Sequence, residues 1–293
     1  MRIILLTILF TYLNQFSVIR THSHSSEPLL LLVSFDGFRW DYLNNHNLTN
    51  FNSLKEDGAY SDYIINNFVT VTLPNFWSIV TGLYEETHGM IQNEMYDPVL
   101  NEDFSLSASD KKTVQNLDNF KWFAQNNITE PIWITNQKHS KSRLSAAEWI
   151  GSNLVIHGES IISVPYNQTR PFNDIIDEFI QLFTREEEPI NFGAIYFNEP
   201  DHTGHMFGPY SKELAEKLLF CDSTLGYLIE QLKDHHLFDK INIIVTADHG
   251  MAQISEKNAR FLDKYVDINL FNYYGTRSVW NLFVKNGKIL NYS

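Results

Sequence analysis

Three short, uncharged, apolar runs constrain the fold of this chain more than any other feature of its sequence. They cover Leu29–Phe35, Phe192–Phe197 and Ile241–Ala247. A continuous apolar run without a polar face is typical of a strand inside a parallel sheet that is covered on both sides. Amphipathic helical patterns precede or separate them, at Asp174–Phe183 and Ser211–His235. Strands that alternate with helices predict an α/β fold, with a mostly parallel central sheet flanked by helices.

Weaker patterns suggest the structure of the intervening segments. The polar segment Asp41–Asp57 has apolar positions at helical spacing and predicts a helical connection. We expect a strand at Pro131–Thr135, β structure at Tyr60–Val71, a helix at Thr113–Asn126, and loops at Ala146–Ser152 and Val164–Asn167. No internal repeat, low-complexity tract or linker interrupts this order, so residues 28–293 are expected to form one domain.

Each of the three apolar runs is followed by an aspartate. These are Asp36, Asp201 and Asp248, and two histidines accompany them: His205 lies four residues after Asp201, and His249 follows Asp248. Ligands of open α/β sheets bind outside the carboxyl ends of the strands, so these side chains are expected to converge at one edge. Crowded carboxylates repel one another unless a cation keeps them ionised. Carboxylate and imidazole ligands together suit zinc, and the pattern therefore predicts a metal site.

A second feature is the segment Val69–Asn75, which leads from β-branched residues into an apolar helical pattern. Thr72 occupies the expected N-cap position, and Pro74 suits the first helical turn. Two interpretations are open from this stretch alone. Thr72 either only caps the helix, which is the commoner use of such a hydroxyl, or it is a nucleophile facing an anion at the helix N-terminus.

Composition limits the partners of the chain. It has 293 residues, of which 43% are hydrophobic, enough for a substantial core. Acidic residues outnumber basic ones by 35 to 22, and no run of lysine and arginine appears. Proteins that grip nucleic-acid polymers usually carry a basic face, so we expect none as a partner. An anionic small-molecule substrate would instead need local positive charge, which a bound metal supplies.

The N-terminus has the layout of a secretory signal peptide, with Arg2 before the apolar run Ile3–Phe10 and polar residues from position 21. That run is too short to span a bilayer, and we place the signal at about residues 1–24. Four glycosylation sequons agree with export, at Asn47, Asn127, Asn167 and Asn291. No second apolar span is apparent, so we expect a secreted protein or one on the extracellular face of the cell. Cys221, the only cysteine, fits a buried thiol.

Six motifs, taken together, indicate a known family. In chain order they are Phe35–Arg39, Thr72–Asn75, Ile79–Tyr84, His88–Asn93, Glu199–His205 and Asp248–Met251. By them the chain resembles the ectonucleotide pyrophosphatase/phosphodiesterase family of the alkaline phosphatase superfamily, in its short form without extra cysteine-rich or nuclease-like domains. The resemblance covers residues 28–293 and implies an alkaline-phosphatase-like fold. It also implies an enzyme that hydrolyses phosphodiester or pyrophosphate bonds of nucleotides.

The resemblance further assigns roles to single residues. It implies two zinc ions, one held by Asp36, Thr72, Asp248 and His249 and the other by Asp201 and His205. Thr72 would be the nucleophile and would form a phospho-threonine intermediate. Asn93 would bind phosphoryl oxygens, and Tyr166 would stack on the base. Threonine is a poor nucleophile unless a metal lowers its pKa, and paired zinc ions stabilise both the attacking and the leaving oxygens.

The chain departs from the family pattern at two places. The family's second zinc takes another histidine well downstream, whereas His249 is the last histidine here, so we expect the sequence to be incomplete at its C-terminus. Leu73 stands where nucleotide-cleaving relatives often have an aromatic residue that sandwiches the base with the residue at Tyr166. These departures leave two alternatives: a choline-phosphodiester phosphodiesterase of the same family, and an exported ectodomain that keeps the fold without catalysis.

Overall fold

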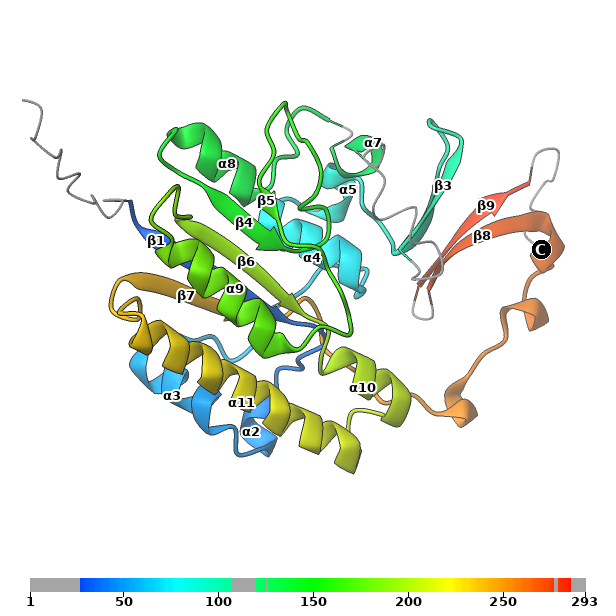
Figure 1. The fold of residues 1–293 in the computed structure, drawn as a ribbon. Coiled ribbons are helices and arrows are strands. Elements are labelled where there is room, and N and C mark those ends of the chain that lie inside the picture. Colours follow the sequence, from blue (N-terminus) through cyan, green and yellow to red (C-terminus); the bar gives the residue numbers. More distant parts are fainter. Residues whose placement is uncertain (1–26, 107–119, 125, 277–278, 286–293) are drawn as a thin grey trace, which may run out of the picture.

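The computed structural model describes residues 27–106, 120–124, 126–276 and 279–285. The expected signal peptide and the sequon at Asn291 lie outside these residues. Five strands form the central sheet, in the order β5-β4-β6-β1-β7, and every pair is parallel (Figure 1). Their bounds are β1 (Leu29–Phe35), β4 (Ser145–Glu148), β5 (Ile162–Ser163), β6 (Phe192–Phe197) and β7 (Ile241–Thr246). The predicted α/β fold with a parallel central sheet is confirmed.

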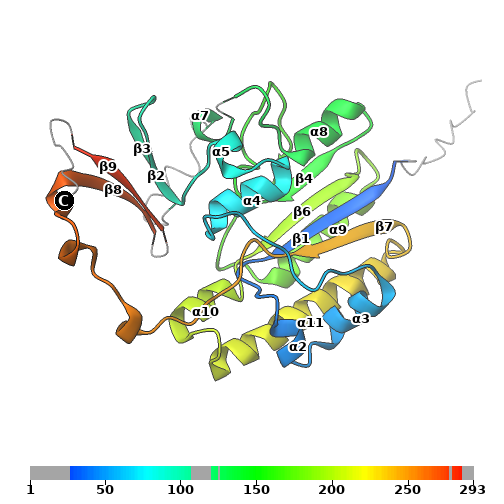
Figure 2. The same ribbon diagram turned by 180° about the vertical axis from the view of Figure 1, so that it is seen from behind.

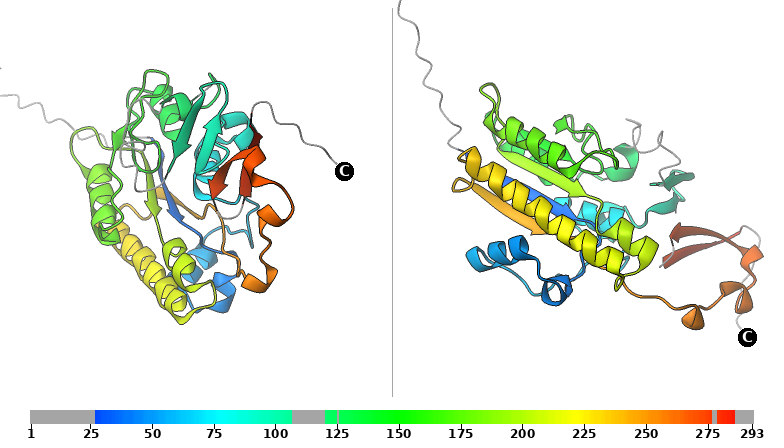
Figure 3. Two further views of the ribbon diagram at one scale, coloured as in Figure 1. Left: turned by 90° about the vertical axis from the view of Figure 1, so that its right-hand side faces the viewer. Right: turned by 60° about the horizontal axis from the view of Figure 1, so that its bottom comes forward.

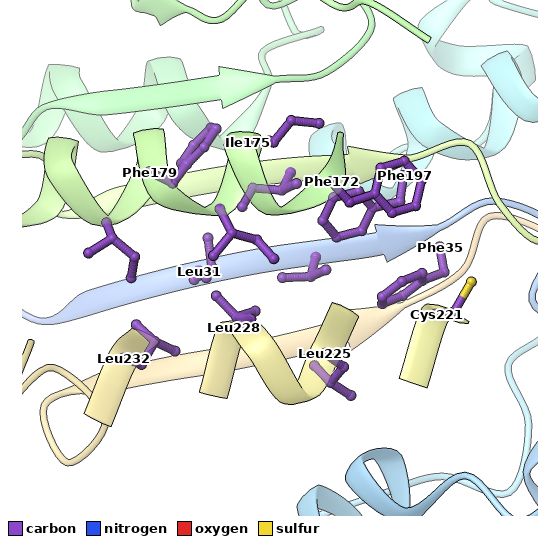
Figure 4. Packing of buried hydrophobic residues seen from close by; sticks show 14 of the residues in the cluster. Leu31, Phe35, Phe172, Ile175, Phe179, Phe197, Cys221, Leu225, Leu228 and Leu232 are labelled. Carbon is purple, nitrogen blue, oxygen red and sulfur yellow. The ribbon is translucent and has the colours of Figure 1, made fainter. Parts of the chain in front are cut away.

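Both faces of the sheet are covered, as the apolar runs predicted. On β1, Leu31 and Phe35 pack into one core cluster, and Leu32 packs into the other. Because successive side chains point to opposite faces of a strand, a central strand needs apolar residues at every position. Helices α9 (Phe172–Thr184) and α11 (Lys212–Asp234) cover the first face (Figure 4).

The second face is covered by α4 (Thr72–Thr81) and α8 (Ile132–His139) (Figure 2). This cluster is rich in large aromatic side chains, among them Trp77, Trp133 and Trp149. Helix α4 ends at Gly82, whose φ of 69° is the left-handed conformation that glycine adopts without steric cost. The two clusters hold β1 and β6 from opposite sides and so fix where the carboxyl ends of these strands lie.

Several of the weaker expectations were wrong. Residues from Ile132 onward form helix α8 rather than a strand, with Pro131 as its N-cap. A short, mostly apolar run fits a buried helix as well as a strand, and periodicity does not distinguish them. The expected loop at Ala146–Ser152 begins inside β4, where two small alanines pack in the centre of the sheet. Tyr60–Val71 forms no strand.

Shorter elements complete the described chain. They are α2 (Tyr42–Asn45), α3 (Thr49–Asp57), α5 (Glu85–His88), β2 (Glu94–Asp97), β3 (Glu102–Ser105), α7 (Phe120–Phe123), α10 (Asp201–Phe207), η4 (Glu256–Asn258), η5 (Leu262–Lys264), η6 (Ile268–Leu270), β8 (Phe271–Thr276) and β9 (Val279–Val284). Helices α2 and α3 confirm the helical connection. Of the helix expected at Thr113–Asn126, only α7 falls within the described residues. The β8–β9 hairpin lies apart from the sheet, beside β2–β3 (Figures 1 and 3).

The long helix α11 matches its sequence pattern closely. The Ser211 hydroxyl caps it by accepting a hydrogen bond from Leu214 N, as expected. Cys221 is fully buried on its inner face, as predicted, and burial raises the pKa of the thiol. None of the helices in the described part of the chain has the length and apolar character needed to cross a bilayer.

Candidate metal centre

The three strand-end aspartates meet at the carboxyl edge of the sheet. Asp36 follows β1, Asp248 lies two residues after β7, and Asp201 begins α10 beyond the end of β6. Ligand atoms of Asp36, Asp201 and His249 all lie within 4.8 Å of one another. Among the described residues, these three side chains form a group that could hold a metal ion. Asp201 N donates a hydrogen bond to the carbonyl of Asp36 at 2.9 Å. Segments far apart in sequence are therefore brought into one cluster by the sheet.

Gly37 makes this convergence possible. Its φ is +68°, and a Cβ placed on it would lie 2.8 Å from the Cβ of Asp201. Its N–H donates to Asp248 Oδ1 at 3.1 Å. A larger residue could not turn the chain here and let Asp201 approach. Asp36 thus supplies one carboxylate, and the Gly37 N–H orients the carboxylate of Asp248. The absence of a side chain at Gly37 leaves room for Asp201.

His249 presents a lone pair to the cluster. Its Nδ1 lies 2.9 Å from the carbonyl of Gly250. A carbonyl only accepts, so Nδ1 carries a proton, and in the neutral ring Nε2 then has a free lone pair, the tautomer suited to a metal ligand. This Nε2 lies 3.5 Å from Asp36 Oδ1 and 3.3 Å from Asp248 Oδ2. Three acceptor atoms thus face one another, an arrangement that a cation between them would stabilise.

Thr72 joins the same group. Its hydroxyl lies 3.3 Å from His249 Nε2, to which it can donate. Thr72 is the first residue of α4, the N-cap is Val71, and no side chain caps the helix. The expected N-cap position for Thr72 was therefore wrong by one residue, and its hydroxyl faces the histidine rather than the helix backbone. Asn75 holds the preceding loop by donating to the carbonyls of Val69 and Val71.

The electrostatics of the cluster fit a bound cation. Asp36 Oδ1, Asp201 Oδ1 and Asp248 Oδ2 are buried and accept no hydrogen bond from the described residues. Burial, followed by repulsion from Asp248 and Asp201, raises the pKa of Asp36 well above its usual range. Burial also raises the pKa of Asp248 to about 7. A divalent cation would offset both costs, so these residues fit the expected metal.

The second expected zinc group is smaller. Asp201 and His205 lie four residues apart in α10, with His205 Nε2 3.3 Å from Asp201 Oδ1. His88, another histidine of the family motifs, is buried, and its Nε2 lies 2.8 Å from Ser78 Oγ. Its Nδ1 accepts from Met90 N at 3.1 Å, and burial lowers the pKa of the ring to about 4. Both nitrogens of His88 are thus committed to structural contacts.

The expected substrate residues differ in their placement. Asn93 Oδ1 accepts from Leu73 N at 2.8 Å, which turns its amide nitrogen, a donor, to the other side. Tyr166 is half-exposed beside the cluster, with its ring centroid 5.5 Å from that of Tyr196. Leu73 has no exposed surface and packs into the second core cluster. In this structure Leu73 supports the helix that carries Thr72, and its contact with substrate stays a prediction.

Two residues near the site escaped the sequence analysis. The Tyr196 hydroxyl donates to Asp36 Oδ2 at 2.7 Å. Glu148, the last residue of β4, is another buried carboxyl at this edge; its Oε2 lies 3.7 Å from Arg170 Nη1. Burial raises the pKa of Glu148 to about 7. Glu148 also lies at a strand end, as the three aspartates do. The two alanines before it do not form a recognisable strand pattern, so that strand was not predicted.

The fold and the site together define an α/β protein with a cluster of metal-ligand groups at the carboxyl edge of a parallel sheet. The sequence profile of the type I phosphodiesterase / nucleotide pyrophosphatase family matches residues 30–292, and the chain belongs to this family. The expected family is thereby confirmed.

Similar proteins support the assignment to this family. The chain is 38% identical over 260 residues to ectonucleotide pyrophosphatase/phosphodiesterase family member 5 of Homo sapiens, covering 88% of this chain and 52% of that protein. It is 40% identical over 247 residues to bis(5'-adenosyl)-triphosphatase enpp4 of Mus musculus, covering 84% and 52%. The chain therefore spans about half the length of these relatives.

A solved structure agrees with the fold. Murine ectonucleotide pyrophosphatase/phosphodiesterase 5, in an inactive threonine-to-alanine form in complex with AMP, matches with a TM-score of 0.81 and 37% identity. The match covers 89% of this chain and 67% of that one. The predicted alkaline-phosphatase-like fold is confirmed by this likeness.

Proposed function

We propose that this chain is the catalytic part of a zinc-dependent hydrolase that cleaves phosphodiester or pyrophosphate bonds of extracellular nucleotides. The observation that carries the proposal is the position of the Thr72 hydroxyl, 3.3 Å from His249 Nε2 at the start of α4. A hydroxyl there has no capping role and lies against a cluster of acceptor atoms. In a family of phosphodiesterases and nucleotide pyrophosphatases, a nucleophile is the function that fits it best.

Each ligand group has a defined part in this proposal. Asp36, Thr72, Asp248 and His249 would hold one zinc ion, and Asp201 with His205 would contribute to the second. Bound zinc would supply Lewis acidity, lowering the pKa of the Thr72 hydroxyl and neutralising charge on the phosphoryl group. Two zinc ions are part of the proposal. The described residues give a well-formed group of ligands for the first ion and only part of a group for the second.

The reaction would proceed in two displacements. Thr72 Oγ forms a bond to phosphorus as the bond from phosphorus to the leaving oxygen breaks, which yields a phospho-threonine. Water then attacks the same phosphorus, and Thr72 regains its hydroxyl. The positive end of α4 and the amide nitrogen of Asn93 would stabilise the phosphoryl oxygens during both steps.

Tyr166 suggests how a nucleotide would be held. Its half-exposed ring beside the cluster offers a face for a base, and such stacking contributes about 1–3 kcal/mol. The murine relative binds AMP, and another relative is a bis(5'-adenosyl)-triphosphatase, which favours adenine nucleotides. Because Leu73 is buried, stacking here would occur on one side of the base only.

The proposed location is outside the cell. It is supported by the signal-like N-terminus and by three sequon asparagines, Asn47, Asn127 and Asn167, all of which are exposed. Two relatives also carry ectonucleotide pyrophosphatase in their names, consistent with action at the cell exterior.

The proposal is tested by hydrolysis of an aryl ester of a nucleoside 5'-monophosphate, with a phosphocholine aryl ester as the alternative substrate. Thr72→Ala should lower kcat by about 10³-fold or more, because the nucleophile is lost. Removal of zinc by a chelator should abolish turnover, and added zinc should restore it.

Thr81→Ala is the matched control. It removes a hydroxyl from the same helix, one that donates to the carbonyl of Trp77 at 2.6 Å and does not face the cluster. Its rate should stay within about twofold of the unmodified protein. Equal rates for Thr72→Ala and Thr81→Ala would contradict the proposal, and faster turnover of the phosphocholine ester would point to the choline alternative.

A further inference from the structure

Among the described residues, Tyr196 donates a side-chain hydrogen bond to the carboxylate of Asp36. Tyr196 lies near the end of β6, and its hydroxyl donates to Asp36 Oδ2 at 2.7 Å. The register of the sheet explains the contact, because Tyr196 pairs with Ser34, two residues before Asp36 on the neighbouring strand β1. Side chains two residues apart on a strand share one face, so Tyr196 reaches the carboxylate directly.

Two aromatic rings lie against the ring of Tyr196. It is buried, and it packs edge-on against Phe76, with ring centroids 4.8 Å apart and an interplanar angle of 77°. Phe76 lies one helical turn after Thr72 on α4. The Tyr166 ring is a second neighbour, with its centroid 5.5 Å from that of Tyr196. A ring held in this way places its hydroxyl at one position, so it can fix the carboxylate to which it donates.

The hydrogen bond leaves the two oxygens of Asp36 with different surroundings. Oδ2 accepts from Tyr196, whereas Oδ1 accepts no hydrogen bond within the described part of the chain and lies 3.5 Å from His249 Nε2. Rotation of the carboxylate would break the bond to Tyr196. The tyrosine therefore holds Oδ1 toward the point that a cation would occupy.

We propose that Tyr196 is a positioning residue of the metal centre, which fixes the Asp36 carboxylate so that Oδ1 faces the cation together with His249 Nε2. This inference rests on the proposed function, since it concerns the same zinc ion. Groups that orient metal ligands through hydrogen bonds typically contribute about 10- to 100-fold to metal affinity. Tyr196 acts through Asp36 and does not itself touch the metal.

The test compares zinc affinity in two variants that each lose one tyrosine hydroxyl. Tyr196→Phe keeps the ring and its packing. Tyr227→Phe is the matched control, because its hydroxyl also donates to an aspartate, Asp177 Oδ1, at 2.7 Å, between α11 and α9. Titration of the metal-free full chain with zinc, against a chromogenic chelator, should show about 10- to 100-fold weaker binding for Tyr196→Phe and no change for Tyr227→Phe.

A second measurement distinguishes positioning from a general effect on the fold. In an Asp36→Ala background, Tyr196→Phe should weaken zinc binding no further, because the residue through which it acts is gone. A defect of folding would instead persist in that background. With cobalt(II) in place of zinc, the visible absorption of Tyr196→Phe should also differ from that of Tyr227→Phe.

The outcomes separate the two proposals. If the unmodified chain binds no zinc, both the proposed function and the role of Tyr196 are overturned. If the chain binds zinc and Tyr196→Phe binds it equally well, only the role of Tyr196 fails. Additive effects of Tyr196→Phe and Asp36→Ala would also overturn it, since an effect independent of Asp36 would then be at work.

Discussion

The two halves of the candidate metal centre differ in how they are built. Around His249, the side chains of Asp36, Asp248 and His249 are 4%, 0% and 8% exposed, and they come from the ends of two adjacent strands. Around His205, the side chains of Asp201 and His205 are 16% and 44% exposed, and both belong to the short helix α10. The first half is fixed by the sheet, and the second projects from one helical turn.

This difference has a physical consequence. Buried acceptors that face one another carry a desolvation cost that a cation offsets, so the His249 half gains more from binding metal. The His205 half is more exposed and gains less. We therefore expect the His249 half to bind zinc more tightly, and the following predictions test that ranking.

The largest effect is expected from removing one imidazole from each half. His249→Ala should weaken the tighter zinc site by more than the 10- to 100-fold typical of groups that only orient ligands, because a direct ligand is lost. His205→Ala should leave that site intact and affect only weaker binding. Calorimetric titration of the metal-free chain with zinc measures both, and loss of the tighter site in His205→Ala alone would reverse the ranking.

The next prediction concerns Gly37, which lies between the two halves. A Cβ at this position would meet the Cβ and Cα of Asp201 at 2.8 and 2.9 Å, and φ is +68°. Gly37→Ala should therefore lower the free energy of unfolding by about 2–5 kcal/mol, from backbone strain together with overpacking. Denaturant unfolding of the metal-free chain measures this loss.

Gly82→Ala provides the matched control for Gly37→Ala. Gly82 has nearly the same φ, +69°, but a Cβ there would meet nothing within 4 Å. The free energy of unfolding of this variant should fall only by the cost of the left-handed conformation, about 1–2 kcal/mol. Equal losses in the two variants would mean that Asp201 moves aside readily, and that the halves are less rigidly joined than the contact at Gly37 indicates.

The smallest effect is expected at Glu148, a buried carboxyl at the same edge but outside both halves. Its pKa is raised to about 7 by burial, the attraction of Arg170 opposes the rise, and Glu178 adds to it. The folded chain thus binds this proton more tightly than the unfolded chain. Stability from Glu148 is present below pH 4.5 and is lost as pH rises through about 7.

Glu148→Gln isolates this contribution. At pH 8 the variant should exceed the unmodified chain in free energy of unfolding by roughly 1–3 kcal/mol, and near pH 4 the two should be similar. Denaturant unfolding at both pH values, without metal, measures the difference. If the gap between the two chains were the same at both pH values, Glu148 would not be the titrating group.

The sequence predicted most of the site because its signals are local. Asp36, Asp201 and Asp248 each follow an apolar run, and that run is itself the evidence for a strand. In a parallel sheet, the carboxyl ends of strands share an edge, so convergence follows from fold class alone. The same reasoning placed His249 and His205 near the cluster without any knowledge of their contacts.

The tertiary structure decided what depends on neighbours that lie far away in the chain. The hydrogen bond from Tyr196 to Asp36 joins residues separated by 160 positions. The burial of Leu73 and the strand around Glu148 depend likewise on packing against other elements. A pair of alanines or a short apolar run fits helix or strand equally well, and only the surrounding core selects between them.

The position of Thr72 depends on both the sequence and the tertiary structure. The sequence by itself determined that a hydroxyl stands at the start of a helix, because the β-branched approach and Pro74 mark that boundary. It did not determine whether the hydroxyl caps the helix or faces His249 and the strand-end aspartates. That was decided by the sheet, which brings His249, 177 residues away, to within 3.3 Å of the hydroxyl oxygen.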